Sequence, residues 1–300
     1  SFRNLDLLNR ANVIDENTYE VSIVSSYNDR KYQQEISAGA LGSVSLQLNS
    51  FNKISVKSIL NINSSNSVSQ RNGEDFSRQD QLKGSEFTFK QNTFFTVQAN
   101  GEHRLIKPLT FKWYGAFNIL DGHIPDQRRI LYSKEAGTQH PYRLLISNTL
   151  SQQSGSRIYQ SLSDYIYTAG GDLSYKFKWL EQNQTLKGGY MLQVKDRLYD
   201  AKLFANYLPL DNDALRLLPA DQIFLPENFG DGTANKFAFD AIKGNTFRYL
   251  ANTILNAGFL QLDNEFTKNL RVVWGLRVEN YDQLVGSVKQ SDPRHTRTQV

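Results

Sequence analysis

The sequence predicts an all-β protein, a segment of an antiparallel up-and-down transmembrane β-barrel with about eight long strands. The first reason is the alternation of apolar and polar residues. Every second side chain from Leu270 to Val278 is apolar, whereas the intervening positions include the charged residues Arg271 and Arg277, and Glu279 continues that series. A period of two indicates a strand with two unlike faces. The second reason is that short connections alternate with long ones, as in barrels with short periplasmic turns and long extracellular loops.

The composition suits a barrel better than a helical membrane protein. Of the 300 residues, 39% are hydrophobic and 21% are charged, and the mean hydropathy is −0.51. No run of about 18 apolar residues is present, so the sequence predicts no membrane-spanning helix. A barrel needs no such run, because only alternate residues face lipid. The aromatic content of 12% fits strands and the aromatic girdles of barrels.

Charge and cysteine content narrow the function classes. The net charge is +4, from 34 basic and 30 acidic residues that are interspersed, so no basic block predicts binding to nucleic acid. Without cysteine the chain forms no disulfide and no cysteine-based metal site. The first ten residues lack the basic and apolar regions of a signal peptide. We therefore expect either a cytoplasmic protein or a piece of a longer one.

Eight segments carry the alternation, and none of the positions on their less polar faces is Asp, Glu, Lys or Arg. A midplane Lys or Arg facing lipid costs about 2–4 kcal/mol, so this exclusion is what a bilayer requires. Counted from the first to the last residue of the less polar face, the segments are 38–48, 54–62, 87–99, 109–119, 165–179, 186–194, 247–259 and 270–278. The opposite faces carry Lys53, Lys57, Lys90, Glu102, Lys112, Asp172, Lys176, Lys178, Lys187, Lys195, Arg197, Arg271, Arg277 and Glu279.

The connections have two lengths. Short turns are expected at 49–53, 104–108, 180–184 and 265–269. Long segments are expected at 64–84, 121–160 and 208–245, the last with a short helix around 214–224. A soluble sandwich spreads its loop lengths more evenly. We expect the first strand to begin near residue 31, because the preceding residues have helical stretches and little alternation. The chain then divides into the end of an extracellular loop (1–30), a partial barrel (31–288) and the start of another loop (289–300).

Three stretches resemble a known family. "GALGSVSLQLNSFNKISVKSILNINSSN" is similar to a strand, tight turn and strand of TonB-dependent outer-membrane receptors of the kind abundant in Bacteroidetes. "NLRVVWGLRVENYD" resembles that family's recurring G-x-R-x-E strand, here Gly275, Arg277 and Glu279, and "LPENFG" resembles a loop before a down-strand. The resemblance covers about residues 30 to 290, and it rests on the order and spacing of motifs that are individually weak.

The resemblance implies a fold and a function. The family's fold is a 22-stranded barrel with an N-terminal plug. Its members lie in the outer membrane and import bulky, scarce nutrients such as siderophores, haem, cobalamin or glycans. Their partners are lipid, the TonB complex acting through the plug and, in some cases, a surface lipoprotein. This chain shows no TonB box, no plug and no C-terminal strand ending in an aromatic residue, so we interpret it as a middle part of the barrel. We expect no enzymatic activity and no cofactor.

Two other interpretations stay open. Eight strands can close into a small passive barrel, although many charged side chains would then crowd a narrow lumen. Alternatively, the chain is a soluble or surface-attached β-rich module that binds glycans with its aromatic residues. A two-layer sandwich that buries Trp113 and Trp274 would support the second interpretation.

The candidate site residues are charged positions expected to face a lumen: Lys187, Lys195, Arg197, Arg271, Arg277 and Glu279. Arg277 and Glu279 share a face, which predicts a structural ion pair in preference to a contact with a plug or a substrate. Trp113, Trp179 and Trp274 are expected in a lipid-facing girdle in preference to a ligand platform.

The remaining motifs give little indication of a metal site or a catalytic site. His123 lies near two aspartates, and "LDNDA" (210–214) has carboxylates without the Gly and Glu spacing of a calcium loop. No metalloprotease, nucleophile-elbow or phosphate-loop motif is present. We therefore predict no catalytic, cofactor or metal residue.

Overall fold

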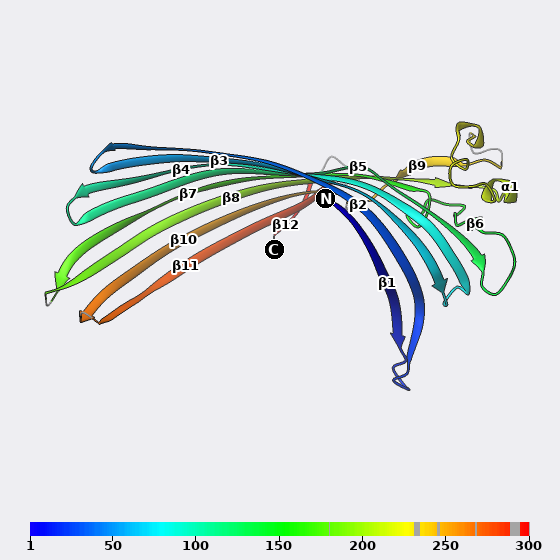
Figure 1. Cartoon of the computed structure of the whole chain (residues 1–300), viewed down its shortest axis with the longest axis horizontal. Coiled ribbons are helices and arrows are strands. Elements are labelled where there is room, and N and C mark those ends of the chain that lie inside the picture. The colour runs from blue at the N-terminus through cyan, green and yellow to red at the C-terminus, as the bar shows by residue number, and fades with distance from the viewer. Residues whose placement is uncertain (180, 231–234, 245–246, 268, 289–294, 300) are drawn as a thin grey trace.

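The protein is one long antiparallel sheet. A computed structural model describes the chain except residues 180, 231–234, 245–246, 268, 289–294 and 300, with backbone only for 288 and 295–299. The sheet order is β1-β2-β3-β4-β5-β7-β8-β10-β11-β12, with β6 paired to β5 and β9 paired to β8. Neighbouring strands are almost all consecutive in the chain, so the topology is an up-and-down meander (Figure 1).

Most of the strands are far longer than the usual five or six residues. The long strands are β1 (Phe2–Ile14), β2 (Val21–Asn49), β3 (Asn52–Asp75), β4 (Asp80–Ile106), β5 (Leu109–Glu135), β7 (Ser156–Trp179), β8 (Gln182–Tyr207), β10 (Arg248–Thr267) and β11 (Leu270–Val288). The short elements are β6 (Arg143–Leu144), β9 (Ala238–Ile242), β12 (His295–Gln299), helix α1 (Asp213–Arg216) and the 3-10 turn η1 (Pro226–Asn228). No helix among the described residues is long and apolar enough to cross a membrane.

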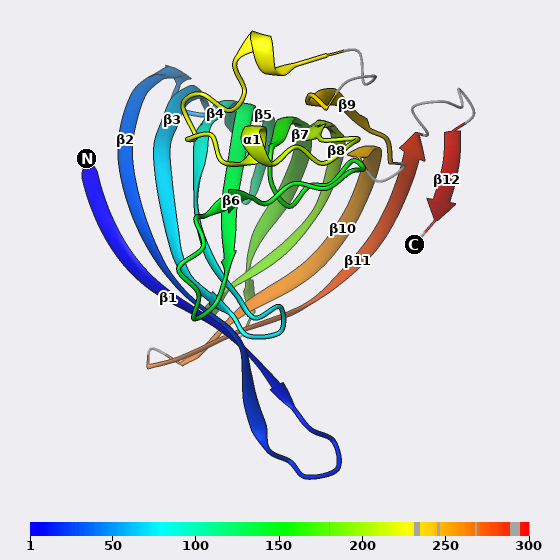
Figure 2. The ribbon, with the colours of Figure 1, turned by 90° about the vertical axis from the view of Figure 1, so that its right-hand side faces the viewer.

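The sheet is open. Strands β1 and β12 lie on opposite sides of a curved wall and do not pair with each other (Figure 2). The predicted all-β, antiparallel, up-and-down architecture is confirmed. The alternative of a closed eight-stranded ring is not formed.

The four predicted short turns are present and share one end of the sheet. They join β2 to β3, β4 to β5, β7 to β8 and β10 to β11, at the left of Figure 1. In the first, the Asn49 side chain accepts hydrogen bonds from the Phe51 amide and the Asn52 side chain, both at 2.9 Å. Such an Asx turn fixes a tight hairpin.

The predicted start of the first strand near residue 31 is wrong. Strand β1 pairs with β2 from Phe2↔Gln34 to Ile14↔Val21. Both faces of β1 are exposed, and a bulge at Ala11/Asn12 breaks its register. Backbone pairing, and not burial of one face, makes these residues strands, so the alternation that marks the other strands is absent.

The first predicted long connection, 64–84, is also wrong. Strands β3 and β4 continue pairing through it, from Ser64↔Gln91 to Asp75↔Asp80, and a tight turn joins them. The Asp75 carboxylate accepts hydrogen bonds from the Ser77 hydroxyl at 2.6 Å and the Arg78 amide at 3.3 Å. Both faces are rich in Ser, Asn and Gln here, so the pattern weakens although the ladder continues.

The second predicted connection, 121–160, is too long, because β5 extends to Glu135 and β7 begins at Ser156. The described residues of 136–155 and of the third connection, 208–247, form what we call the cap. Their buried residues make a small core with β5: Tyr132, Leu144, Leu208, Ile223 and Phe237. The predicted helix around 214–224 is only the four residues of α1, capped by Asn212. Pro219 follows shortly and has no amide hydrogen to extend the helix. The predicted C-terminal loop contains β12, which pairs with β11, while residues 289–294 lie outside the described residues.

Candidate membrane-facing surface and ionic face

The strand register brings the predicted apolar faces together on one side of the sheet. One row of directly paired residues runs across six strands: Val44, Val56, Ala99, Gly115, Ala169 and Leu192. We call this side the apolar face. It extends from β2 to β11 across the sheet, and from the short turns to the first carboxylates along the strands. The opposite side is the ionic face.

No second layer covers the apolar face among the described residues. Val44 is 63% exposed, Trp274 57% and Leu276 78%. Trp113 is only half-buried, so the two tryptophans are not in the core of a sandwich. Contiguous apolar patches on soluble monomers rarely exceed a few hundred Å². The exposed apolar surface of this sheet therefore needs another covering.

Strand β10 corrects one predicted face. The face predicted for 247–259 lies on the ionic side, because Ala251 pairs with Arg197 and Phe259 pairs with Gly189. Phe259 fills the space above that glycine, where an added Cβ would lie 2.5 Å from its ring. The residues that β10 gives to the apolar face are Asn252, Ile254, Asn256, Gly258, Leu260, Leu262 and Asn264.

Carboxylates mark one limit of the uncharged band. The first charged residues on the apolar face are Asp121 of β5, Asp196 of β8 and Asp282 of β11. Traced through the strand between each two, the register sets them about two residues apart. Asp121 and Asp282 each follow the start of their strand by twelve residues. At about 3.4 Å per residue and a tilt of about 45°, this length rises roughly 29 Å. The apolar band of a membrane barrel is about 25 Å tall.

Tryptophans lie near the short turns. Trp113 and Trp274 each lie four residues after the start of their strand. The Trp113 indole donates to His103 Nε2 at 2.9 Å, and the Trp274 indole donates to Asn264 Oδ1 at 2.9 Å. His103 Nδ1 lies 2.8 Å from Asn52 Oδ1. This pattern requires a neutral imidazole with its proton on Nδ1. Trp179, beside its turn, is exposed. Such rings with one polar end suit an apolar–polar boundary.

Opposite charges alternate across the ionic face. Directly paired positions read Lys53, Glu102, Lys112 and Asp172 across β3, β4, β5 and β7. Lys112 Nζ lies 3.1 Å from Glu102, and Lys187 Nζ lies 3.3 Å from Asp172. Opposite charges on facing positions stabilise strand pairing.

All six candidate site residues lie on the ionic face, and each has a partner. Asp164, whose side chain is 3% exposed, accepts from Lys195 at 3.0 Å and from Arg197 at 2.7 Å. The predicted Arg277–Glu279 pair is present at 2.6 Å. Arg271 pairs with Asp263, which the sequence-based reasoning did not single out. These pairs are spread over the sheet, and they form a polar wall and not one compact site.

Neighbouring backbone approaches the ionic face closely at two glycines. A Cβ at Gly189 would lie 2.8 Å from the Gly171 carbonyl oxygen, and one at Gly275 would lie 2.5 Å from the Leu260 oxygen. On the apolar face, a Cβ at Gly115 or Gly258 would meet nothing closer than 4.0 Å. The neighbouring backbone therefore crowds the ionic side, and glycine permits this close approach.

The weak metal motifs are not assembled into a metal site in the described residues. Asp211 lies 3.0 Å from Arg216 and 3.6 Å from Arg143, and Asp213 also pairs with Arg143. Arginines therefore satisfy the carboxylates of "LDNDA". His123 is exposed on β5.

No known protein family matches the chain, and no curated protein matches its sequence. The two faces of the sheet are therefore the features of this chain that bear on its function.

Proposed function

We propose that the chain is part of the barrel wall of a TonB-dependent outer-membrane receptor of the Bacteroidetes type, which imports a bulky, scarce nutrient such as a siderophore, haem, cobalamin or a glycan. One observation carries this proposal: a single uncharged, uncovered face runs in register from β2 to β11. Lipid is the covering that this face fits, because lipid contact removes it from water without a second protein layer.

The ionic face fits a wet bore. The charges of the candidate set are paired, but their lysine and arginine side chains remain partly exposed. Charged groups cost several kcal/mol when they leave water without full compensation. Facing an aqueous lumen avoids that cost, and it places polar groups where a plug would sit.

The open edges imply further strands. Unpaired backbone groups in hydrocarbon cost several kcal/mol each, so only closed barrels and helices span membranes. The outer edge of β1, and the edge of β11 below its short pairing with β12, therefore need partner strands from the rest of a barrel. In this proposal the loops at the capped end select the nutrient. The TonB complex moves a plug, and that plug is not part of this chain. A surface lipoprotein is a further proposed partner.

Cell fractionation and uptake test the proposal. We expect the protein in the outer membrane, and uptake of one of four probes: a ferric siderophore, haem, cobalamin or an oligosaccharide. Uptake is expected to saturate and to stop when the proton-motive force is collapsed. Recovery of the protein in the soluble fraction would contradict the proposal. Uptake that persists without the proton-motive force would indicate a passive barrel instead.

A further inference from the structure

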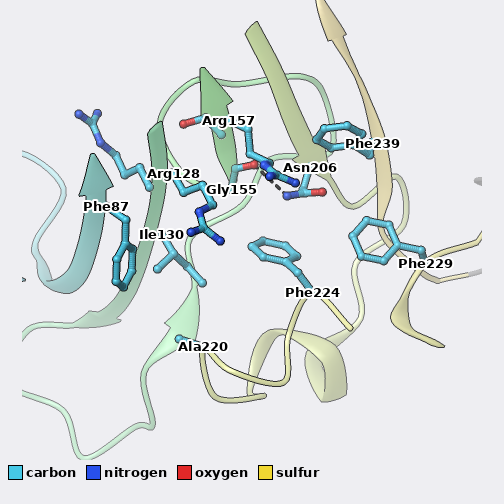
Figure 3. A pocket seen from close by; sticks show the side chains of 12 residues that line it. Phe87, Arg128, Ile130, Gly155, Arg157, Asn206, Ala220, Phe224, Phe229 and Phe239 are labelled. Carbon is cyan, nitrogen blue, oxygen red and sulfur yellow. Dashed lines mark hydrogen bonds between the residues drawn. The ribbon is translucent and has the colours of Figure 1, made fainter. Parts of the chain in front are cut away.

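A pocket of about 650 Å³ lies between the cap and the extended ends of the strands. Its sheet side is formed by Phe87 of β4, Arg128 and Ile130 of β5 and Arg157 of β7, and Phe224 of the cap points into it (Figure 3). The volume is within the range of roughly 300–1,000 Å³ typical of small-molecule sites. The pocket lies beyond the carboxylate that limits the uncharged band on β5, so lipid is not needed to form it.

The cap side of the pocket is a pre-formed aromatic wall. The Phe224 ring packs edge-on against the buried Phe237, with centroids 5.4 Å apart, and Phe229 packs 6.0 Å from Phe237. On the strand side, Phe239 stacks on Phe204 at 5.4 Å. These rings carry no polar atom, so they favour an apolar or planar ring of a ligand.

The sheet side of the pocket is cationic. Arg128, Arg129 and Arg157 line it, and its described lining contains no Asp or Glu. Arg157 is held by a two-pronged bond to Asp126, with Nε at 3.0 Å and Nη2 at 2.7 Å. Arg129 is held by Glu86.

Arg128 is the arginine of this pocket whose guanidinium can bind a further carboxylate. It shares Asp126 with Arg157 through one contact of 3.4 Å, and its side chain is 59% exposed. Three guanidinium groups thus face two carboxylates, which leaves one positive charge in excess. Arginine binds carboxylates through two parallel hydrogen bonds.

Gly155 keeps the space between these two sides open. Its φ of +68° favours glycine, and a Cβ there would lie 3.3 Å from the Phe224 ring. The Asn206 side chain donates to the Gly155 carbonyl oxygen at 2.9 Å and fixes the position.

From the arginines and the aromatic wall we propose that this pocket binds a small carboxylate attached to an aromatic or other planar ring. The ring lies against Phe224 and Phe239, and Arg128 holds the carboxylate. This site goes beyond the proposed function, because its geometry is independent of the membrane assignment.

Calorimetry on the protein in lipid nanodiscs, with empty nanodiscs subtracted, tests the site. The probes are 2-naphthoate and its neutral analogue 2-naphthamide. We expect naphthoate to bind about tenfold more tightly, the equivalent of about 1.4 kcal/mol. Arg128→Gln is expected to remove that preference, whereas Arg78→Gln, an equal charge change in an exposed turn at the same end of the sheet, retains it.

A second variant separates the two sides of the pocket. Phe224→Leu is expected to weaken both probes alike and to leave their ratio unchanged, with an unchanged far-ultraviolet circular dichroism spectrum as the check on folding. Equal affinity for the two probes, no binding of naphthoate, or a preference that survives Arg128→Gln would each overturn the proposal.

Discussion

The two ends of the sheet satisfy their apolar side chains in different ways. At the capped end, loops fold back over β5 and bury Leu144, Ile223 and Phe237. Between the short turns and the first carboxylates, apolar side chains of the same size, such as Val44 and Leu276, stay uncovered. The first arrangement is that of a protein in water, in which apolar surface is removed by packing. In the second arrangement, apolar surface can be removed from water only by something outside this chain, such as lipid.

This difference gives the two regions separate sensitivities. A cavity in the core should destabilise the capped end and leave the uncharged band intact. If lipid covers the apolar face, a charge placed on that face should destabilise the uncharged band and leave the capped end intact.

Phe237→Ala is expected to destabilise the cap by about 3–5 kcal/mol, because it leaves a cavity at a fully buried position. Limited proteolysis should then cut the cap, while amide exchange of β8 between Gln184 and Asp196 stays slow. Phe229→Ala, at the edge of the same core, is the milder comparison. Simultaneous loss of protection in both regions would show that they are one cooperative unit.

Leu192→Arg is expected to destabilise the membrane-inserted protein by about 2–4 kcal/mol, because it places a guanidinium midway across the uncharged band. Met191→Arg, the next residue on the same strand, points to the ionic face and should cost much less. Urea unfolding from lipid vesicles measures both. Equal costs for the two variants would contradict the assignment of faces.

Trp274→Phe is expected to cost about 1 kcal/mol, since it removes the indole hydrogen bond to the buried Asn264. Trp179→Phe is the matched control: its exposure is nearly the same, and the described residues offer its indole no such bond. The same vesicle assay compares them. A larger loss at Trp179 would show that ring volume, and not the hydrogen bond, matters at this boundary.

The smallest expected effect is a loss of stability in acid at the ends of β2 and β3, which lie at the capped end of the sheet. Arg71 holds the Asp29 carboxylate through two bonds of 2.7 Å, and this keeps the pKa of Asp29 below its usual value. The resulting stabilisation is present above about pH 3.9 and is lost as the pH falls through the lowered pKa. For a partly exposed pair it is under about 1 kcal/mol. The protection factors of amides at the ends of β2 and β3 should fall below pH 4, and Asp29→Asn should remove that pH-dependent fall.

The sequence predicted the faces of seven strands correctly, because charged residues mark one side of six of them, and Ser43, Ser45 and Gln47 mark one side of β2. It failed at β10, where residues 249–259 are uncharged on both faces and only pairing with β8 and β11 decides which side is which. It also failed for β1 and for 64–84, where both faces are polar or exposed. The six candidate residues could be placed on a face, but not with partners such as Asp164, since cross-strand register is not visible in one sequence.

The pocket was beyond prediction for a different reason. Arg128 and Phe224 are far apart in the chain and come together only when the cap folds onto the strands. No local pattern specifies how a loop of this length folds back.

Single-cysteine labelling of β8 tests the central claim most directly. The chain contains no cysteine, so a cysteine placed at one of residues 190–195 is its only thiol. In lipid vesicles, a water-soluble maleimide should label positions 191, 193 and 195 and leave 190, 192 and 194 unlabelled. The last three should instead be reached by a lipid-soluble quencher. Labelling of all six positions from water, or protection of the even positions by protein in the absence of lipid, would contradict the account.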